Sequence, residues 1–254
     1  MKVRILGSGT SSGVPRIGND WGACDPQDSR NRRSRASILV WTGTTRILID
    51  TSPDMREQLL AADVADLDAV IWTHDHADHC HGIDDLRQIM HFKGGPVRGL
   101  ARGFTLEQLQ TRFAYAFHGR KGYRPTVTGE VLPDRITIGD VTISAADQPH
   151  GGITSAGLRF DSNDKSIGYA TDFHEMTREM RALYTGLDLW IVDALREKPH
   201  PTHPDLASTL GWIGELVPKR ALLVHMDQSM DYRTLAAKLP EGVSPGYDGL
   251  EMTV

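Results

Sequence analysis

The chain has 254 residues, of which 39% are hydrophobic, and its 28 lysines and arginines against 33 acidic residues give a formal charge of −5. This length can bury the core of one large domain, two cysteines are too few for a disulfide framework, and the net charge argues against general capture of nucleic acid. No stretch approaches the roughly 20 apolar residues of a membrane span, and the first residues lack the apolar segment of a signal peptide, so we expect a cytoplasmic protein.

The first half of the chain alternates short apolar runs with turn residues. Runs at 37–41 and 46–50 flank a four-residue turn, which predicts a β-hairpin and an antiparallel start to a sheet. Residues 53–62 have proline at the first position and apolar residues on one face, which predicts a short helix. The run DAVIWT at 68–73 predicts a buried strand that leads directly into a histidine-rich stretch.

The second half repeats this alternation of strands and helices. Strands are expected near 135–147, 155–162, 165–171, 188–195 and 220–226, and helices near 175–185, 205–217 and 231–238. Strands with interspersed helices in both halves predict an α/β fold with two mixed sheets flanked by helices, an αββα sandwich. We see no linker and expect a single domain over 1–254, in which 91–130 forms an excursion from the core near the substrate site.

The stretch THDHADH places His74, His76, Asp78 and His79 just beyond the end of the predicted strand. Imidazole nitrogen and carboxylate oxygen are the ligands of zinc and related divalent ions. Ligands at i and i+2 of an extended segment project to one side, so His74 and His76 can hold one ion. Asp78 and His79 follow where the chain turns and can face a second ion.

Four residues cannot fill two coordination spheres, so further ligands must come from distant strands. Three residues stand at the ends of predicted strands, namely His150, Asp172 and His225. Residues at the same edge of neighbouring strands converge in space despite large separations in sequence. Taken alone, Asp172 could be a turn residue and His225 a buried strand residue.

The order of these motifs resembles the metallo-β-lactamase superfamily over nearly the whole chain. The matching residues are the HxHxDH signature of His74, His76, Asp78 and His79, followed by His150, Asp172 and His225. The resemblance implies an αββα sandwich with the site along one edge of the paired sheets. It also implies two divalent metal ions, one bound by His74, His76 and His150 and the other by Asp78, His79 and His225, with Asp172 between them.

Other segments are similar to the branch that contains ribonuclease Z and the cyclic-phosphate phosphodiesterase of the carbon–phosphorus lyase pathway, more closely the latter. They are LGSGTSSGVPRIG, GIDDLR and the final YDGLE. In that phosphodiesterase a loop histidine before a helix is proposed to protonate the leaving alkoxide. Here His203 precedes a predicted helix and matches that position, with His200 as the alternative. We therefore count His203, Asp172 and Asp78 as the candidate catalytic residues.

The chain departs from that phosphodiesterase at a structural zinc site. The resemblance implies that the relative builds this site from several N-terminal cysteines and a histidine that follows the last catalytic ligand. Here only Cys24 remains in the first place, and Gln228 stands in the second. A single thiolate cannot build a structural zinc site, so we expect none.

A basic aromatic stretch at 118–124 supplies candidates for substrate binding. With the loop histidine mentioned above, the candidates are His118, Arg120, Lys121, Tyr123, Arg124 and His200. Guanidinium and ammonium groups can bind a second phosphate while tyrosine stacks on a ring. A solvated basic loop explains the stretch equally well.

We therefore expect a dinuclear-metal phosphodiesterase that hydrolyses a small phosphate diester, cyclic or open, with manganese slightly favoured over zinc. The rival enzymatic hypotheses are a tRNA 3′-processing endonuclease and a lactonase or thioesterase. A rival of another class is a non-catalytic metabolite carrier on the same fold. The expected partner is a small phosphorylated substrate, without a membrane or nucleic acid, and homodimerisation is left open.

Overall fold

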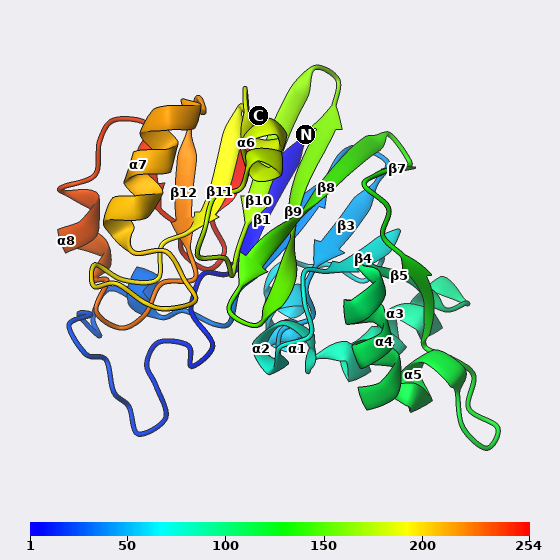
Figure 1. The fold of residues 1–254 in the computed structure, drawn as a ribbon. Helices are drawn as coiled ribbons and strands as arrows, with labels where there is room; N and C mark the ends of the chain where they lie inside the picture. Colours follow the sequence, from blue (N-terminus) through cyan, green and yellow to red (C-terminus); the bar gives the residue numbers. More distant parts are fainter.

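The computed structural model describes residues 1–254, which form two seven-stranded sheets packed face to face (Figure 1). Across the first sheet the order is β14 (Glu251–Thr253), β1 (Lys2–Gly7), β2 (Ser37–Trp41), β3 (Arg46–Ile49), β4 (Ala69–Trp72), β5 (Val97–Ala101) and β6 (Val127–Val131). Across the second it is β13 (Val243–Pro245), β12 (Ala221–Val224), β11 (Leu189–Asp193), β10 (Lys165–Ala170), β9 (Ile153–Ser162), β8 (Val141–His150) and β7 (Arg135–Ile138).

Both sheets are mixed. In the first sheet, β14, β1, β2 and β3 pair antiparallel, whereas β3 to β6 run parallel. In the second, β7 to β10 pair antiparallel and β10 to β13 run parallel. Parallel strands need crossover connections, and these carry the helices to the outer faces. The predicted αββα sandwich of two mixed sheets is confirmed.

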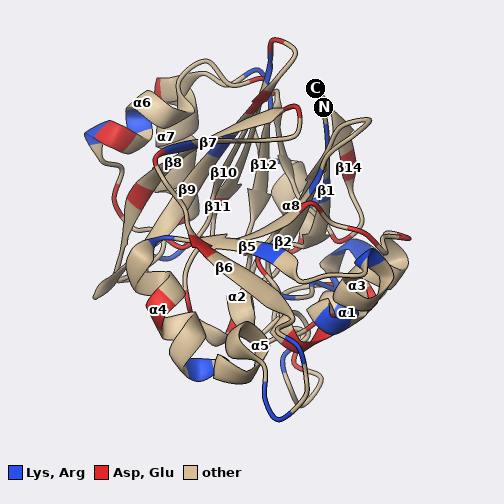
Figure 2. Ribbon diagram, turned by 90° about the vertical axis from the view of Figure 1, so that its right-hand side faces the viewer, with Lys and Arg blue, Asp and Glu red and all other residues tan.

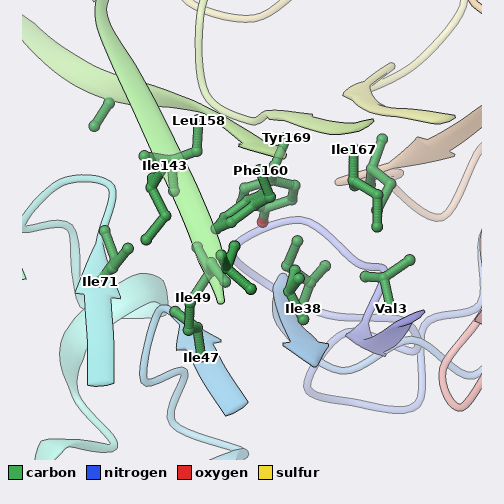
Figure 3. Packing of buried hydrophobic residues seen from close by; sticks show 14 of the residues in the cluster. Val3, Ile38, Ile47, Ile49, Ile71, Ile143, Leu158, Phe160, Ile167 and Tyr169 are labelled. Carbon is green, nitrogen blue, oxygen red and sulfur yellow. The ribbon is translucent and has the colours of Figure 1, made fainter. Parts of the chain in front are cut away.

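The core between the sheets is built from β-branched and aromatic side chains, which suit a pleated buried surface. Figure 3 shows this packing, with Val3, Ile38, Ile47, Ile49 and Ile71 from the first sheet facing Ile143, Leu158, Phe160, Ile167 and Tyr169 from the second. All ten of these side chains are buried. The packed layer holds the two sheets in fixed relation, so their shared edge is a rigid base for a site.

Helices cover the outer face of each sheet. The first sheet carries α1 (Met55–Ala61), α2 (Ala77–Cys80), α3 (Leu86–Lys93), α4 (Gly103–Arg112) and α5 (Ala114–His118), with a short 3-10 turn at Ile83–Asp85. A second 3-10 turn, Ser29–Asn31, contacts the start of α8 through Asn31. The second carries α6 (Arg178–Tyr184), α7 (Leu206–Leu216) and α8 (Tyr232–Ala236). Leu86 and Ile89 of α3 are buried against the first sheet, whereas α6 contacts β8 and β9 of the second.

The segment 91–130 is not a simple excursion from the core, and this corrects the prediction. It contains β5 and most of β6, which extend the parallel part of the first sheet, whereas the end of α3, α4, α5 and the turn after α5 lie outside the sheet. The two strands, VRGLA and VTGEV, each combine a central glycine with charged or polar residues, so the sequence lacks the usual strand pattern there. No helix of the structure is both long and apolar enough to span a bilayer.

Candidate metal centre

The seven candidate ligands lie along one edge of the paired sheets, because each stands at the end of a strand or in the segment just after one. His74 comes two residues after β4, Asp172 two residues after β10, and His225 directly after β12. Asp172 and His225 have φ angles of 55° and 59°, which is left-handed backbone that side chains other than glycine rarely adopt. Such strain persists only where the surrounding structure imposes it, and it occurs most often at functional sites.

A first group of ligands surrounds one point at this edge. Ligand atoms of His74, His76, His150 and Asp172 lie within 4.8 Å of one another. Nδ1 of His76 is 3.3 Å from Nε2 of His150, and Nε2 of His150 is 3.6 Å from Oδ1 of Asp172. Two atoms that each lie about 2.1 Å from a tetrahedral ion are about 3.4 Å apart, so these separations fit a common cation.

A second group lies beside the first. Asp78, His79 and His225 offer ligand atoms that also lie within 4.8 Å of one another. Oδ2 of Asp78 is 3.3 Å from Nε2 of His79 and 3.7 Å from Nε2 of His225. The same geometric argument fits a second cation here.

Asp172 joins the two groups by turning one carboxylate oxygen toward each. Oδ1 lies 3.6 Å from Nε2 of His150 in the first group, whereas Oδ2 lies 3.2 Å from Nε2 of His79 in the second. Oδ2 is also 3.5 Å from Nε2 of His225, and it accepts a 2.6 Å hydrogen bond from the Thr171 hydroxyl. The structure thus brings together all seven residues that the sequence singled out as metal ligands.

Most of the imidazoles are oriented by a partner on the ring nitrogen that faces away from the cluster. Nδ1 of His74 is 3.0 Å from Thr73 Oγ1, Nδ1 of His79 is 2.8 Å from Asp50 Oδ2, and Nδ1 of His150 is 3.0 Å from the Thr202 carbonyl. The opposite atoms, Nε2 of His74, His79 and His225, are buried without a hydrogen-bond partner. Buried polar atoms usually have a partner, and the positions of these three nitrogens fit binding to a divalent cation.

Burial and charge shift the pKa values of the cluster in opposite directions at different residues. Burial lowers the pKa of His74, and the neighbouring His79 acts in the same direction, so this imidazole keeps a free lone pair. Burial acts to raise the pKa of Asp172, but the imidazoles of His225 and His79 outweigh it and hold that pKa well below its usual range. Burial acts to lower the pKa of His79 and of His225, but the charge of Asp172 outweighs it and raises both, so a cation that binds these two nitrogens would displace their protons.

His203, the predicted proton donor, faces this cluster. Its side chain is 12% exposed, and its ring stacks on that of His225 at a centroid distance of 4.8 Å and an angle of 13°. Nδ1 lies 2.9 Å from Oδ2 of Asp193, and Nε2 lies 3.8 Å from Oδ1 of Asp172. The ring of His200 lies farther out, 5.1 Å from that of His203.

The other predicted substrate-binding residues do not lie at the cluster in this chain. His118, Arg120, Lys121, Tyr123 and Arg124 are all exposed. They occupy the end of α5 and the turn after it, at the lower right of Figure 1, whereas α2 and the turn between β8 and β9 lie at the centre. Figure 2 shows the basic residues of this turn below α5. A role for them in binding stays a prediction.

Two buried aspartates that the sequence analysis missed support the ligands. Asp50 follows β3 in left-handed backbone with φ of 64°, and it binds both His79 and the backbone N–H of Thr73. Asp193 ends β11 and accepts hydrogen bonds from His203 and from the backbone N–H of Asp172, the latter at 3.1 Å. Both stand at the ends of buried strands, the same signal that identified Asp172.

A buried guanidinium lies beside Cys24, the one cysteine that remains of the structural zinc site implied for the related phosphodiesterase. Arg33 is 1% exposed, and its Nη1 lies 3.6 Å from Cys24 Sγ and donates to the Asp227 carbonyl at 3.1 Å. Nη2 donates to the Met230 carbonyl at 2.6 Å. Arg33 thus joins the N-terminal loop to the segment that follows His225.

Comparison with known proteins agrees with this geometry. A family model described as the beta-lactamase superfamily domain matches residues 45–226. A diphosphatase from the PhnP family has a similar structure, with a TM-score of 0.90 and 33% identity, covering 99% of this chain and 96% of that one. Human tRNase Z, short form, shares the fold, with a TM-score of 0.68 and 15% identity over 100% of this chain and 99% of that one.

One relative at similar identity is a longer protein than this chain and bears the name of another activity. An octanoyltransferase of Porphyromonas gingivalis is 32% identical over the full length of this chain. This chain spans only 52% of that protein, so about half of the relative has no counterpart here.

Proposed function

This chain belongs to the metallo-β-lactamase superfamily and is a metal-dependent hydrolase, and we propose that it hydrolyses a small phosphate diester, cyclic or open, with two divalent ions. The carboxylate of Asp172 carries this proposal, because one of its oxygens faces each group of ligands. A carboxylate placed in this way can hold two cations side by side and offset their charge. Imidazole and carboxylate ligands accept both manganese and zinc, and we propose manganese slightly ahead of zinc.

The two groups of side chains assign a role to each ligand. The first ion would be held by His74, His76 and His150, the second by Asp78, His79 and His225, and both by Asp172. Bound ions of this kind lower the pKa of a water molecule and neutralise charge on phosphate oxygens. The chain contributes fixed donors, because the hydroxyl of Thr73 and the carboxylate of Asp50 orient the rings of His74 and His79 in advance.

His203 would supply the proton that the leaving oxygen needs. Asp193 binds Nδ1, so the proton to be donated is held at Nε2, the atom that faces the cluster. A histidine suits this role because its ordinary pKa lies near neutral pH. His200 is farther from the cluster, and we propose that it contacts the substrate instead.

The similarity to a diphosphatase over nearly all of both chains favours a bond to phosphorus over a carboxylic ester. The position of His203 suits an acid for an alkoxide leaving group, which phosphate diesters and carboxylic esters have in common. The proposed substrate is small and phosphorylated. We propose that the substrate, or a second chain, also contacts the exposed side chains of the turn after α5, namely His118, Arg120, Lys121, Tyr123 and Arg124.

Hydrolysis assays on metal-loaded protein test this function. The protein is freed of metal, reloaded with Mn²⁺ or Zn²⁺, and assayed with bis(p-nitrophenyl) phosphate and with p-nitrophenyl acetate. We expect turnover of the diester that depends on metal and is abolished in Asp172→Ala. Full metal binding with no diester turnover, or faster turnover of the acetate, would contradict the proposal.

A further inference from the structure

Arg112, the last residue of α4, contacts the loop that carries four of the metal ligands. Its Nη2 donates to Oδ2 of Asp75 at 2.8 Å. Its Nη1 donates to the backbone carbonyl of Asp75 and lies 3.6 Å from Sγ of Cys80. One guanidinium thus contacts a carboxylate and a carbonyl of Asp75 and the thiol of Cys80 at the end of α2.

Asp75 stands between the ligands His74 and His76, but its carboxylate binds Arg112 of α4 and does not join the cluster. Successive side chains of an extended segment point to opposite sides, so Asp75 faces away from the two histidines. Its side chain is only 12% exposed. A carboxylate this buried needs a charged partner, and Arg112 is the one that the structure provides.

The backbone carbonyl of Asp75 is held from two directions. Besides Arg112, it accepts a hydrogen bond of 3.3 Å from the thiol of Cys80, which ends α2. This carbonyl belongs to the peptide that leads into His76. The orientation of that peptide is therefore fixed by groups outside the ligand set.

His76 depends on its backbone more than the other two histidines of the first group do. The rings of His74, His79 and His150 each have a partner on the nitrogen that faces away from the cluster. Nε2 of His76 has none, and His76 is the exposed member of the first group. Ligands without a second hydrogen bond lack the usual means of fixing the ring.

We propose that Arg112 is a positioning residue for the metal site formed by His74, His76 and His150. By binding Asp75 it holds the backbone that keeps Nδ1 of His76 3.3 Å from Nε2 of His150. The segment 91–130, through α4, thereby supports the site without contributing a ligand. This inference rests on the metal binding of the proposed function but on none of its substrate chemistry.

Metal titration without substrate tests this inference. Zn²⁺ alone is titrated in competition with a chromophoric chelator into wild type, Arg112→Met, Arg112→Lys and Arg98→Met. Arg98 is the matched control, because it is 35% exposed against 40% for Arg112 and binds Glu130 with Nε at 3.0 Å and Nη2 at 2.7 Å, away from the ligand loop.

We expect Arg112→Met to lower the affinity for one of the two bound ions about 10-fold. This is the usual loss when a residue that orients a metal ligand is removed. Arg112→Lys should restore part of the affinity, because lysine keeps the charge but cannot make the forked contact. Arg98→Met should bind both ions as wild type does. Unchanged affinity in Arg112→Met, or an equal loss in Arg98→Met, would overturn the inference.

Asp75→Asn keeps the inference testable if Arg112→Met fails to fold. Asparagine keeps the shape but loses the charge-assisted bond, so the same ion should bind more weakly, and wild-type affinity would overturn the inference. The double variant Arg112→Met/Asp75→Asn should lose no more affinity for this ion than Arg112→Met alone, since the two side chains act through one contact. A protein that binds both ions normally but hydrolyses no diester would refute the proposed function and leave this inference standing.

Discussion

Asp193 accepts a hydrogen bond of 2.9 Å from Nδ1 of His203, and this contact leaves Nε2 of the imidazole facing the metal cluster. The same oxygen of Asp193 accepts the backbone N–H of Asp172 at 3.1 Å. One fully buried carboxylate therefore orients both the proposed proton donor and the residue between the two ligand groups. The relationship links the acid and the metal site through a single side chain.

Replacing His203 with alanine should slow hydrolysis by an amount that depends on the leaving group of the substrate. We expect a loss of about 100-fold or more with an alkyl phosphodiester, because an alkoxide needs a proton, and a much smaller loss with p-nitrophenolate. Metal content should be unchanged. The rates of both substrates are measured alongside His91→Ala, which changes a histidine of α3 that makes no contact with the cluster. Equal losses with the two substrates would remove His203 from the role of acid.

Replacing Asp50 with asparagine should weaken metal binding at the second group. Asparagine tolerates the left-handed backbone at this position, so the main change is the loss of the charge that orients His79. We expect affinity for one ion to fall about 10- to 100-fold. Chelator competition gives the two dissociation constants, and wild-type values would show that the Asp50 contact is dispensable.

The two thiols should resist alkylation in the folded protein. Burial raises the pKa of Cys80 to about 12 and also raises that of Cys24. A thiol whose folded pKa exceeds its unfolded value of about 9 stabilises the fold below pH 9, and this contribution falls as the pH rises toward 12. We expect iodoacetamide at pH 8 to modify both cysteines only after denaturation. Rapid modification of the native protein would contradict the burial of these groups.

Replacing Arg33 with methionine should destabilise the fold. The change leaves the buried carbonyls of Asp227 and Met230 without their donor, at a cost on the order of 3 kcal/mol. The control is Arg32→Met, because Arg32 is exposed and a surface change of this kind stays within about 0.5 kcal/mol. Urea unfolding compares the two variants, and equal stabilities would show that the buried guanidinium has no supporting role.

Much of the fold and the ligand set followed from one regularity of the sequence, the polar residue at the end of a buried strand. The runs before His74, Asp172 and His225 are apolar and short, so they predicted strands, and neighbouring strands bring their ends to one edge. Asp50 and Asp193 occupy equivalent positions, but neither stands in a metal-ligand motif, so the sequence did not predict a role for them. Their function is to orient other side chains, which no spacing pattern reveals.

Other features depended on contacts that the sequence does not encode locally. β5 and β6 are short strands that contain glycine, and they form because the first sheet offers β4 as a partner. The link between Arg112 and Asp75 joins residues 37 positions apart. Arg120 and Lys121 were expected near the substrate because of their charge. The charge of a residue does not determine the direction in which its turn extends from the fold.

Crystals of the protein loaded with Mn²⁺ or Zn²⁺ and measured at the absorption edge of the metal test the central claim most directly. The account predicts two anomalous peaks per chain, one among His74, His76 and His150 and one among Asp78, His79 and His225, with Asp172 contacting both. A single peak at full loading, or peaks away from these side chains, would contradict it.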